Sequence, residues 1–179
     1  APPAIISIFL GSELSDILEK LSENKPVKST NGNYLELGVN SLPKLPKDST
    51  DRNRTSPFAF TGNKFEFRMV PSSGSISMPN TVLNAVVADV LSEFASELEK
   101  SKDITGTIKE IVARTYKNHK KIIFNGNGYA DEWLKEAEKR GLPNIKSTVE
   151  SIPALVSESS INLFTKYNIM TKEELESRY

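Results

Sequence analysis

Hydrophobic residues follow two different spacings along the chain, and the spacing changes near residue 80. Residues 4–10 form a short apolar run rich in β-branched side chains, which predicts a buried strand. In residues 65–68, apolar and charged side chains alternate. This alternation predicts a strand with its phenylalanines on one face and with Glu66 and Arg68 on the other.

A helical segment and a long polar stretch separate these two predicted strands. Residues 12–21 carry leucine and isoleucine at helical spacing, and Ser12 is the predicted N-cap. Residues 22–57 are mainly polar and contain a short apolar segment at 34–37. A loop of this length usually has a function of its own or packs against another part of the protein.

From residue 80 onward the apolar spacing is helical. Apolar residues recur through 82–98 and predict a helix capped by Asn80 that ends near residue 100. Further helices are predicted at residues 104–116, 130–140, 157–167 and 171–178, the last starting with a capping box at Thr171 and Glu174. The chain is therefore expected to be an α+β protein, with a loop-rich, β-containing first part and an all-helical second part.

Composition and charge argue against several classes of function. The chain has 23 basic and 23 acidic residues, which disfavours nucleic acid or a membrane surface as its main partner. No apolar run approaches the roughly 20 residues of a spanning helix, and the run at 5–10 has no basic flank, so neither a membrane segment nor a signal peptide is expected. The absence of cysteine excludes disulfides, and the single His119 excludes a multi-histidine metal site. The simplest setting is the cytoplasm.

The most informative polar residues lie in the segment 51–58 and in the strand 64–68. Two arginines of a polar loop, Arg52 and Arg54, suit recognition of phosphate or carboxylate, because guanidinium is a rigid fork of donors. On the strand face, Glu66 and Arg68 should lie roughly 6–7 Å apart, too far for an ideal ion pair but suitable for a metal ligand beside an anion clamp. A surface loop followed by a solvent-facing strand with ordinary charges is the alternative, and spacing does not exclude it.

Three other features have plainer explanations. The basic run at residues 114–121 is best explained as a solvated helix end with cations near its C-terminus. The sequence Asn-Gly-Asn-Gly at 125–128 lacks the spacing of a phosphate-binding loop and predicts a tight turn. The apolar stripe of residues 82–98 indicates packing in a core or an interface rather than a cofactor site.

The polar motifs resemble those of the glutamine synthetase family. The segment 51–60, with Arg-Asn-Arg-Thr-Ser at 52–56, resembles the family's Asn-Arg-Ser/Thr segment, and residues 64–68 resemble its Glu-x-Arg strand. Residues 1–6 look like those after its Glu-Ala-Pro turn, and residues 79–98 look like the helix after the strand. Residues 120–142 are similar to the helical extension of the long bacterial type III form. The resemblance covers nearly the whole chain and implies a C-terminal fragment.

The resemblance also implies an activity and a set of site residues. The family joins ammonium to glutamate through γ-glutamyl phosphate, using ATP and Mg²⁺ or Mn²⁺, in a homo-oligomeric ring. By resemblance, Glu66 ligates a metal ion, Arg54 neutralises charge during phosphoryl transfer, and Arg68 binds glutamate or the acyl phosphate. Arg54 and Lys64 would lie near the nucleotide. One departure is Ala59, where commoner types carry a second arginine.

These implications define the expected organisation. Residues 1–78 would form the C-terminal part of the catalytic domain, a partial β-sheet with an insertion at about 11–50, and residues 79–179 a helical subdomain. We expect glutamate–ammonia ligation by the full-length protein and no activity from the fragment alone, because the family's other metal ligands are absent from it. Two alternatives stay open: a non-catalytic helical scaffold or oligomerisation module, and a related ligase that joins glutamate to another amine.

Overall fold

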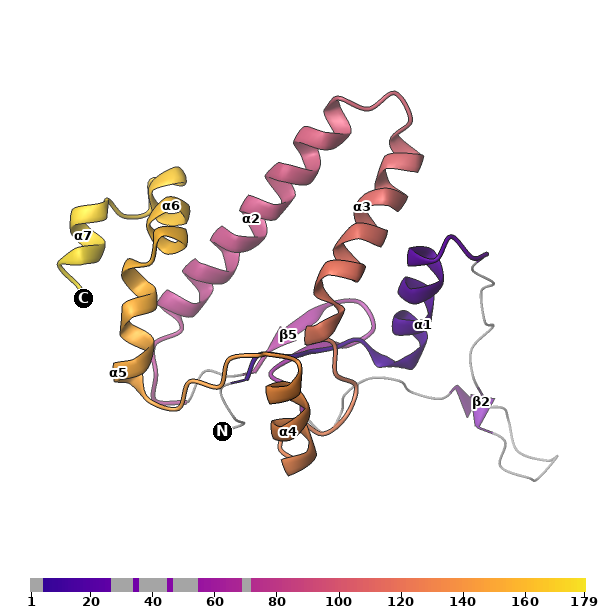
Figure 1. The fold of residues 1–179 in the computed structure, drawn as a ribbon, viewed down its shortest axis with the longest axis horizontal. Helices are drawn as coiled ribbons and strands as arrows, with labels where there is room; N and C mark the ends of the chain where they lie inside the picture. Colours follow the sequence, from indigo (N-terminus) through magenta and orange to yellow (C-terminus); the bar gives the residue numbers. More distant parts are fainter. Residues whose placement is uncertain (1–4, 27–33, 36–44, 47–54, 69–71) are drawn as a thin grey trace.

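The structure is a computed structural model that describes residues 5–26, 34–35, 45–46, 55–68 and 72–179. A small sheet lies beside the foot of a long hairpin formed by two helices (Figure 1). Short helices lie near the start of the hairpin's longer arm, beside its shorter arm and below the sheet. The elements, in chain order, are β1 (Ile8–Phe9), α1 (Gly11–Ser22), β2 (Tyr34–Leu35), β3 (Leu45–Pro46), β4 (Phe58–Phe60), β5 (Phe65–Phe67), α2 (Ser77–Glu99), α3 (Ile104–His119), η1 (Lys120–Ile122), α4 (Asp131–Lys139), α5 (Thr148–Ser151), η2 (Ile152–Val156), α6 (Glu158–Lys166) and α7 (Lys172–Glu176).

The main sheet has three strands in the order β1-β4-β5. Strand β1 pairs in parallel with β4, and β4 pairs antiparallel with β5, which places Ala59 opposite Glu66. Of the strand predicted at residues 4–10, residue 4 lies outside the described residues, and within 5–10 the strand is confirmed at Ile8–Phe9, where it pairs with two residues of β4. Strands β2 and β3 form a separate antiparallel pair within the polar stretch at 22–57.

Helix α1 is confirmed, but its predicted N-cap is wrong. The N-cap position is Leu10, which has no side chain able to cap the helix, and Ser12 lies inside the first turn. The amide groups of Leu10 and Gly11 instead donate hydrogen bonds to Oδ1 of Asn125, at 3.0 Å each. The cap of this helix therefore comes from a residue 114 positions away in the sequence.

Helices α2 and α3 form the long hairpin. Helix α2 begins at Ser77 rather than after Asn80. Pro79 lies in its first turn, where the missing N–H of proline costs no helical hydrogen bond. The predicted cap at Asn80 is thus wrong. Helix α3 begins as expected at Ile104, and its N-cap Asp103 accepts a hydrogen bond from the amide of Gly106.

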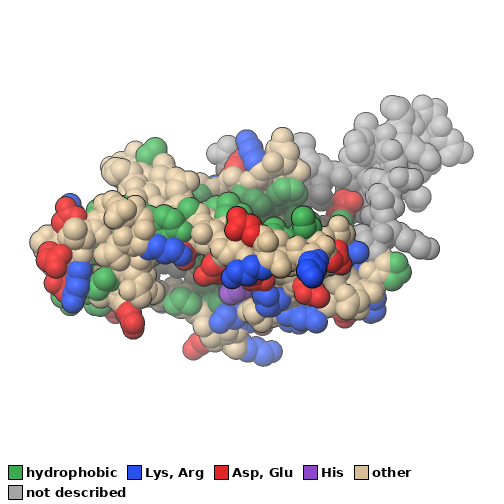
Figure 2. Space-filling model, turned by 90° about the horizontal axis from the view of Figure 1, so that it is seen from above, with side chains coloured by type: hydrophobic (Ala, Val, Ile, Leu, Met, Phe, Trp, Pro, Cys, Tyr) green, Lys and Arg blue, Asp and Glu red, His purple; other side chains and the backbone are tan. Residues whose placement is uncertain are grey.

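The apolar stripe of α2 is not a core of the described part of the chain. Only Ala85 is buried in this helix, while Val86, Val87, Val90 and Leu91 are exposed. Hydrophobic side chains are accordingly visible between charged ones when the molecule is seen from the end of the α2–α3 hairpin (Figure 2). The expectation of core packing is wrong for these four residues, and the expectation of an interface stays a prediction.

The hydrophobic core cluster lies where α4 meets Ile5, in the segment before β1. Ile5, Trp133 and Ala137 are buried together, and the ring of Phe124 stacks on Trp133 with a centroid distance of 4.2 Å. The guanidinium of Arg140 covers the same indole ring at 5.5 Å from its centroid. The amide of Phe124 donates to the carbonyl of Ile8, so the second half of the chain is joined to the sheet at this point.

The C-terminal helices pack beside the start of α2 (Figure 1). Helix α6 begins after Ser157, whose side chain accepts from the amide of Ser160, and α7 has the predicted capping box of Thr171 and Glu174. The short helices α5 and η2 were not predicted. Among the described helices, none is both long and apolar enough to cross a membrane.

Candidate functional site

The β4–β5 hairpin supplies the candidate site, and its two faces differ in chemistry. One face carries phenylalanines, whose rings lie 5.4 Å apart for Phe58 and Phe65 and 5.3 Å apart for Phe60 and Phe65. At the turn, the amide and hydroxyl groups of Thr61 donate to the carbonyl of Lys64, at 2.8 and 3.3 Å. The aromatic contacts and the closed turn hold the strand that carries Glu66 in a fixed register.

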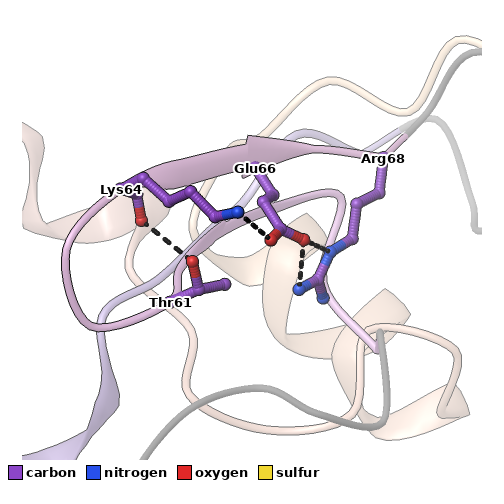
Figure 3. Close-up of polar contacts among 4 residues, drawn as sticks. All are labelled: Thr61, Lys64, Glu66 and Arg68. Atoms are coloured by element: carbon purple, nitrogen blue, oxygen red, sulfur yellow. Dashed lines mark hydrogen bonds and ion pairs between the residues drawn. The ribbon is translucent and has the colours of Figure 1, made fainter.

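Glu66 lies between two cations on the polar side of the hairpin (Figure 3). Its Oε2 accepts hydrogen bonds from Nε and Nη2 of Arg68, at 3.1 and 3.0 Å. Its Oε1 lies 3.4 Å from Nζ of Lys64. Each carboxylate oxygen therefore faces a different cation.

This geometry corrects one prediction. The backbone spacing at i and i+2 indicated a distance too long for an ideal ion pair, yet Glu66 and Arg68 form one with two hydrogen bonds. Arg68 lies just beyond the end of β5, and its long side chain reaches back along the strand toward the carboxylate. The error came from treating the backbone spacing as the distance between charged groups.

The two cations change the acidity of Glu66. The hydrogen bonds from Arg68, and then the interaction with Lys64, hold the pKa of the Glu66 carboxyl below its ordinary value. Glu66 is therefore a carboxylate at neutral pH. A carboxylate is a suitable oxygen ligand for Mg²⁺ or Mn²⁺, so the residue fits a metal site as one ligand of several.

The three charged side chains differ in exposure. The side chain of Arg68 is 14% exposed, that of Glu66 37% and that of Lys64 65%. Arg68 is thus held in a defined position, while Oε1 of Glu66 faces the exposed ammonium group of a flexible side chain. Oε1 is the carboxylate oxygen that an incoming cation could reach with the least rearrangement.

Ala59 lies directly opposite Glu66 in the hairpin and is completely buried. This is the position at which the resemblance leads one to expect a second arginine in commoner types. Alanine leaves no positive charge there, and the described cations next to Glu66 are Lys64 and Arg68.

Other predicted features of the site are tested only in part. Arg52 and Arg54 lie outside the described residues, so the roles expected for Arg54 stay predictions. Within the described ranges, no three His, Asp or Glu side chains gather closely enough to hold a metal ion. A metal bound at Glu66 would therefore need ligands from elsewhere.

Known proteins are similar to both parts of the chain. Residues 107–179 match the family model described as glutamine synthetase C-terminal domain. Over 99% of its length, the chain is 45% identical to a type-3 glutamine synthetase of Dictyostelium discoideum, of which it covers 25%. The chain belongs to the glutamine synthetase family. The resemblance drawn from residues 52–56 and 64–68 is confirmed.

Two bacterial glutamine synthetases show the same extent of similarity. The chain is 44% identical to that of Butyrivibrio fibrisolvens over 100% of its length, and 38% identical to that of Bacteroides fragilis over 99%. It spans about a quarter of the length of the curated relatives it matches. The chain thus corresponds to one portion of each of these glutamine synthetases.

The sequence does not indicate two backbone hydrogen bonds of this glutamine synthetase chain that fix the candidate hairpin and the segment before it. The amide of Gly128 donates to the carbonyl of Thr55 at 2.9 Å, and the amide of Arg68 donates to the carbonyl of Pro57 at 2.8 Å. The 125–128 motif was interpreted only as a tight turn. Its two asparagine–glycine pairs were the available signal, but no spacing rule connects them to residue 55.

Proposed function

We propose that this chain is part of an enzyme that joins ammonium to glutamate, with ATP and Mg²⁺ or Mn²⁺, through γ-glutamyl phosphate. The proposal is supported by similarity to glutamine synthetases over the whole chain, including the hairpin. The observation that carries it is the carboxylate of Glu66 held between Lys64 and Arg68 on a rigid hairpin. Such an arrangement suits a reaction in which anionic groups and a divalent cation meet.

Each of the three residues has a distinct proposed role. Glu66 would contribute one oxygen ligand to a divalent metal ion, with Oε1 as the more accessible atom. When bound, the ion neutralises charge on the phosphoryl group being transferred. Arg68 would bind the glutamate substrate or the acyl phosphate, because a partly buried guanidinium offers a fixed fork of donors.

Two basic residues, Lys64 and Arg54, would act on the nucleotide. Lys64, exposed at the end of the hairpin, would contact a phosphate group once its ammonium no longer faces Glu66. Arg54, by resemblance, would neutralise charge during phosphoryl transfer. Ammonium, glutamate and ATP are the proposed substrates, and the homo-oligomeric ring and the cytoplasmic setting are proposals of the same standing.

We expect no glutamine synthesis from this chain in isolation. The chain spans a quarter of its relatives, and its described residues supply one candidate carboxylate for the metal rather than a set. The whole-chain similarity favours this ligase over a scaffold without catalytic residues. A ligase for a different amine would use the same hairpin, since the roles proposed for its residues concern glutamate, phosphate and the metal ion rather than the amine.

The experiment that tests the proposal is phosphate release by the full-length protein with ATP, Mg²⁺ and glutamate, with and without ammonium. Glu66→Ala should lower ammonium-dependent release by about 100-fold or more, because a metal ligand is lost. The matched control is Glu97→Ala, which removes the same carboxylate from an ion pair with Arg114 on the α2–α3 hairpin. The control should keep near-normal activity.

The possible outcomes separate the alternatives. Release that requires an amine other than ammonium would identify the related ligase. Release that is absent from a folded, metal-loaded protein, or equal in both variants and the parent, would contradict the proposed function.

A further inference from the structure

The turn at residues 125–128 connects segments that are far apart in the sequence. The side chain of Asn125 accepts from the amides of Leu10 and Gly11 and donates to the hydroxyl of Ser15 at 2.9 Å. Three residues later, the amide of Gly128 donates to the carbonyl of Thr55 at 2.9 Å. The turn thus holds the start of α1 and Thr55, which lies three residues before the candidate hairpin.

The close contact with Thr55 leaves no room for a side chain at residue 128. A Cβ atom at this position would lie 2.5 Å from the carbonyl oxygen of Thr55, a backbone atom that cannot move aside by rotating a side chain. Any larger residue must therefore displace the turn or the segment at residue 55.

The segment that follows Thr55 connects this contact to the candidate site. Ser56 and Pro57 are both buried, and the ring of Pro57 restricts the backbone. The carbonyl of Pro57 accepts from the amide of Arg68. A displacement of Thr55 would therefore shift the buried residues Ser56 and Pro57. The backbone of Arg68, which is hydrogen-bonded to Pro57, would shift with them and change the ion pair with Glu66.

The turn is itself firmly held on its other side. Phe124, directly before it, stacks on Trp133, which is 1% exposed. Arg140 donates to the carbonyls of Lys121 and Ile123, at 3.2 and 2.9 Å. Because this side of the turn is anchored in the α4 core, a clash at Gly128 should move the hairpin segment rather than the core.

We infer that Gly128 is a positioning residue for Arg68 and Glu66, through which the helical part of the chain fixes the candidate catalytic hairpin. This inference rests on the proposed function of that hairpin. Gly128 itself touches neither charged side chain in the contacts described above. Its effect on the reaction is exerted through Thr55 and Pro57, and small displacements of a catalytic group cost large factors in rate.

The test is a double-mutant cycle in the full-length protein, with ammonium-dependent phosphate release as the activity. Gly128→Ala should lower kcat by about tenfold in the parent but by less than about twofold in an Arg68→Ala background, because the group it positions is already absent. Gly141→Ala is the matched control. Gly141 has φ of 67° and nothing within 4 Å of an added Cβ, so its substitution strains the backbone without displacing a neighbour.

If Gly128→Ala lowers kcat by the same factor in both backgrounds, the effect is a general structural one and the inference is overturned. The same holds if Gly141→Ala, at the same melting temperature, lowers kcat as much as Gly128→Ala does. If Arg68→Ala is as active as the parent, the proposed function of the hairpin fails and this inference fails with it. If Gly128→Ala does not fold, Asn125→Ala replaces it, since it loosens the turn without a clash. Its smaller loss should also vanish in the Arg68→Ala background, and a loss that persists there would overturn the inference.

Discussion

Two helices that both carry apolar residues at helical spacing are covered very differently. In α4, Trp133 and Ala137 are completely or almost completely buried together with Ile5, and Phe124 packs against them. In α2, Leu91 is 58% exposed and its apolar neighbours are exposed with it. The comparison shows that apolar spacing predicts a helix and the face that avoids water, but not whether this chain supplies what covers that face.

The two regions also differ in how they are connected to the candidate site. The covered region around α4 holds the turn at 125–128, which contacts Thr55 in the segment before the candidate hairpin. The exposed stripe of α2 has no such connection to Glu66 in the described contacts. We therefore expect substitutions near α4 to lower stability strongly and substitutions on the α2 stripe to have little effect on the folding of one subunit.

The largest expected effect is that of Trp133→Ala. The substitution removes the ring that stacks on Phe124 and lies under Arg140, and it should lower the free energy of unfolding by about 3–5 kcal/mol. The measurement is urea unfolding of the full-length protein, followed by circular dichroism. A loss under about 1 kcal/mol would show that this region is not the principal core.

A matched pair of leucines tests the comparison directly. Leu175 of α7 is 0% exposed, and Leu91 of α2 is mostly exposed. Leu175→Ala should cost about 2–5 kcal/mol, whereas Leu91→Ala should change the free energy of unfolding by less than about 0.5 kcal/mol. Equal losses would mean that α2 is covered in the full-length protein, and analytical ultracentrifugation would then show whether Leu91→Ala also weakens assembly.

The smallest expected effect concerns the contact between α2 and α6. Asp89 accepts from Lys166 and from the hydroxyl of Tyr167. The hydrogen bond from Lys166 holds the pKa of Asp89 below its ordinary 3.8, and Asp89 holds the pKa of Lys166 above its ordinary 10.5. The contribution of Asp89 is therefore present above 3.8 and lost as the pH falls through the lowered pKa. That of Lys166 is present below 10.5 and lost as the pH rises through the raised pKa.

The check is the difference in melting temperature between the parent and Asp89→Asn across pH. The difference should be constant between these limits and should shrink outside them. Because both side chains are partly solvated, it should also decrease in high salt. A difference that does not change from neutral to strongly acidic pH would exclude this ion pair as its source.

Features set by neighbours in the sequence could be predicted. The capping box of Thr171 and Glu174, the start of α3 and the strand β5 follow from local spacing and local hydrogen bonds. The motifs around Glu66 were likewise sufficient for the family. Each of these features depends on residues only a few positions apart.

Features that depend on distant partners could not be predicted. The cap of α1 comes from Asn125, and the length of β1 is set by its pairing with β4. The contact of Gly128 with Thr55 joins positions that no periodicity relates. The ion pair of Arg68 with Glu66 was missed for a different reason, since side-chain reach rather than backbone spacing decides it.

The central claim is that the β4–β5 hairpin supplies a metal-binding carboxylate to a glutamine-forming reaction. The most direct test is the rate of ammonium-dependent phosphate release by full-length Glu66→Ala, compared with that of Glu97→Ala under the same conditions. The account predicts a loss of about 100-fold or more for Glu66→Ala, unchanged melting temperature, and near-parent activity for Glu97→Ala. Parent-level release by a folded Glu66→Ala protein would contradict it.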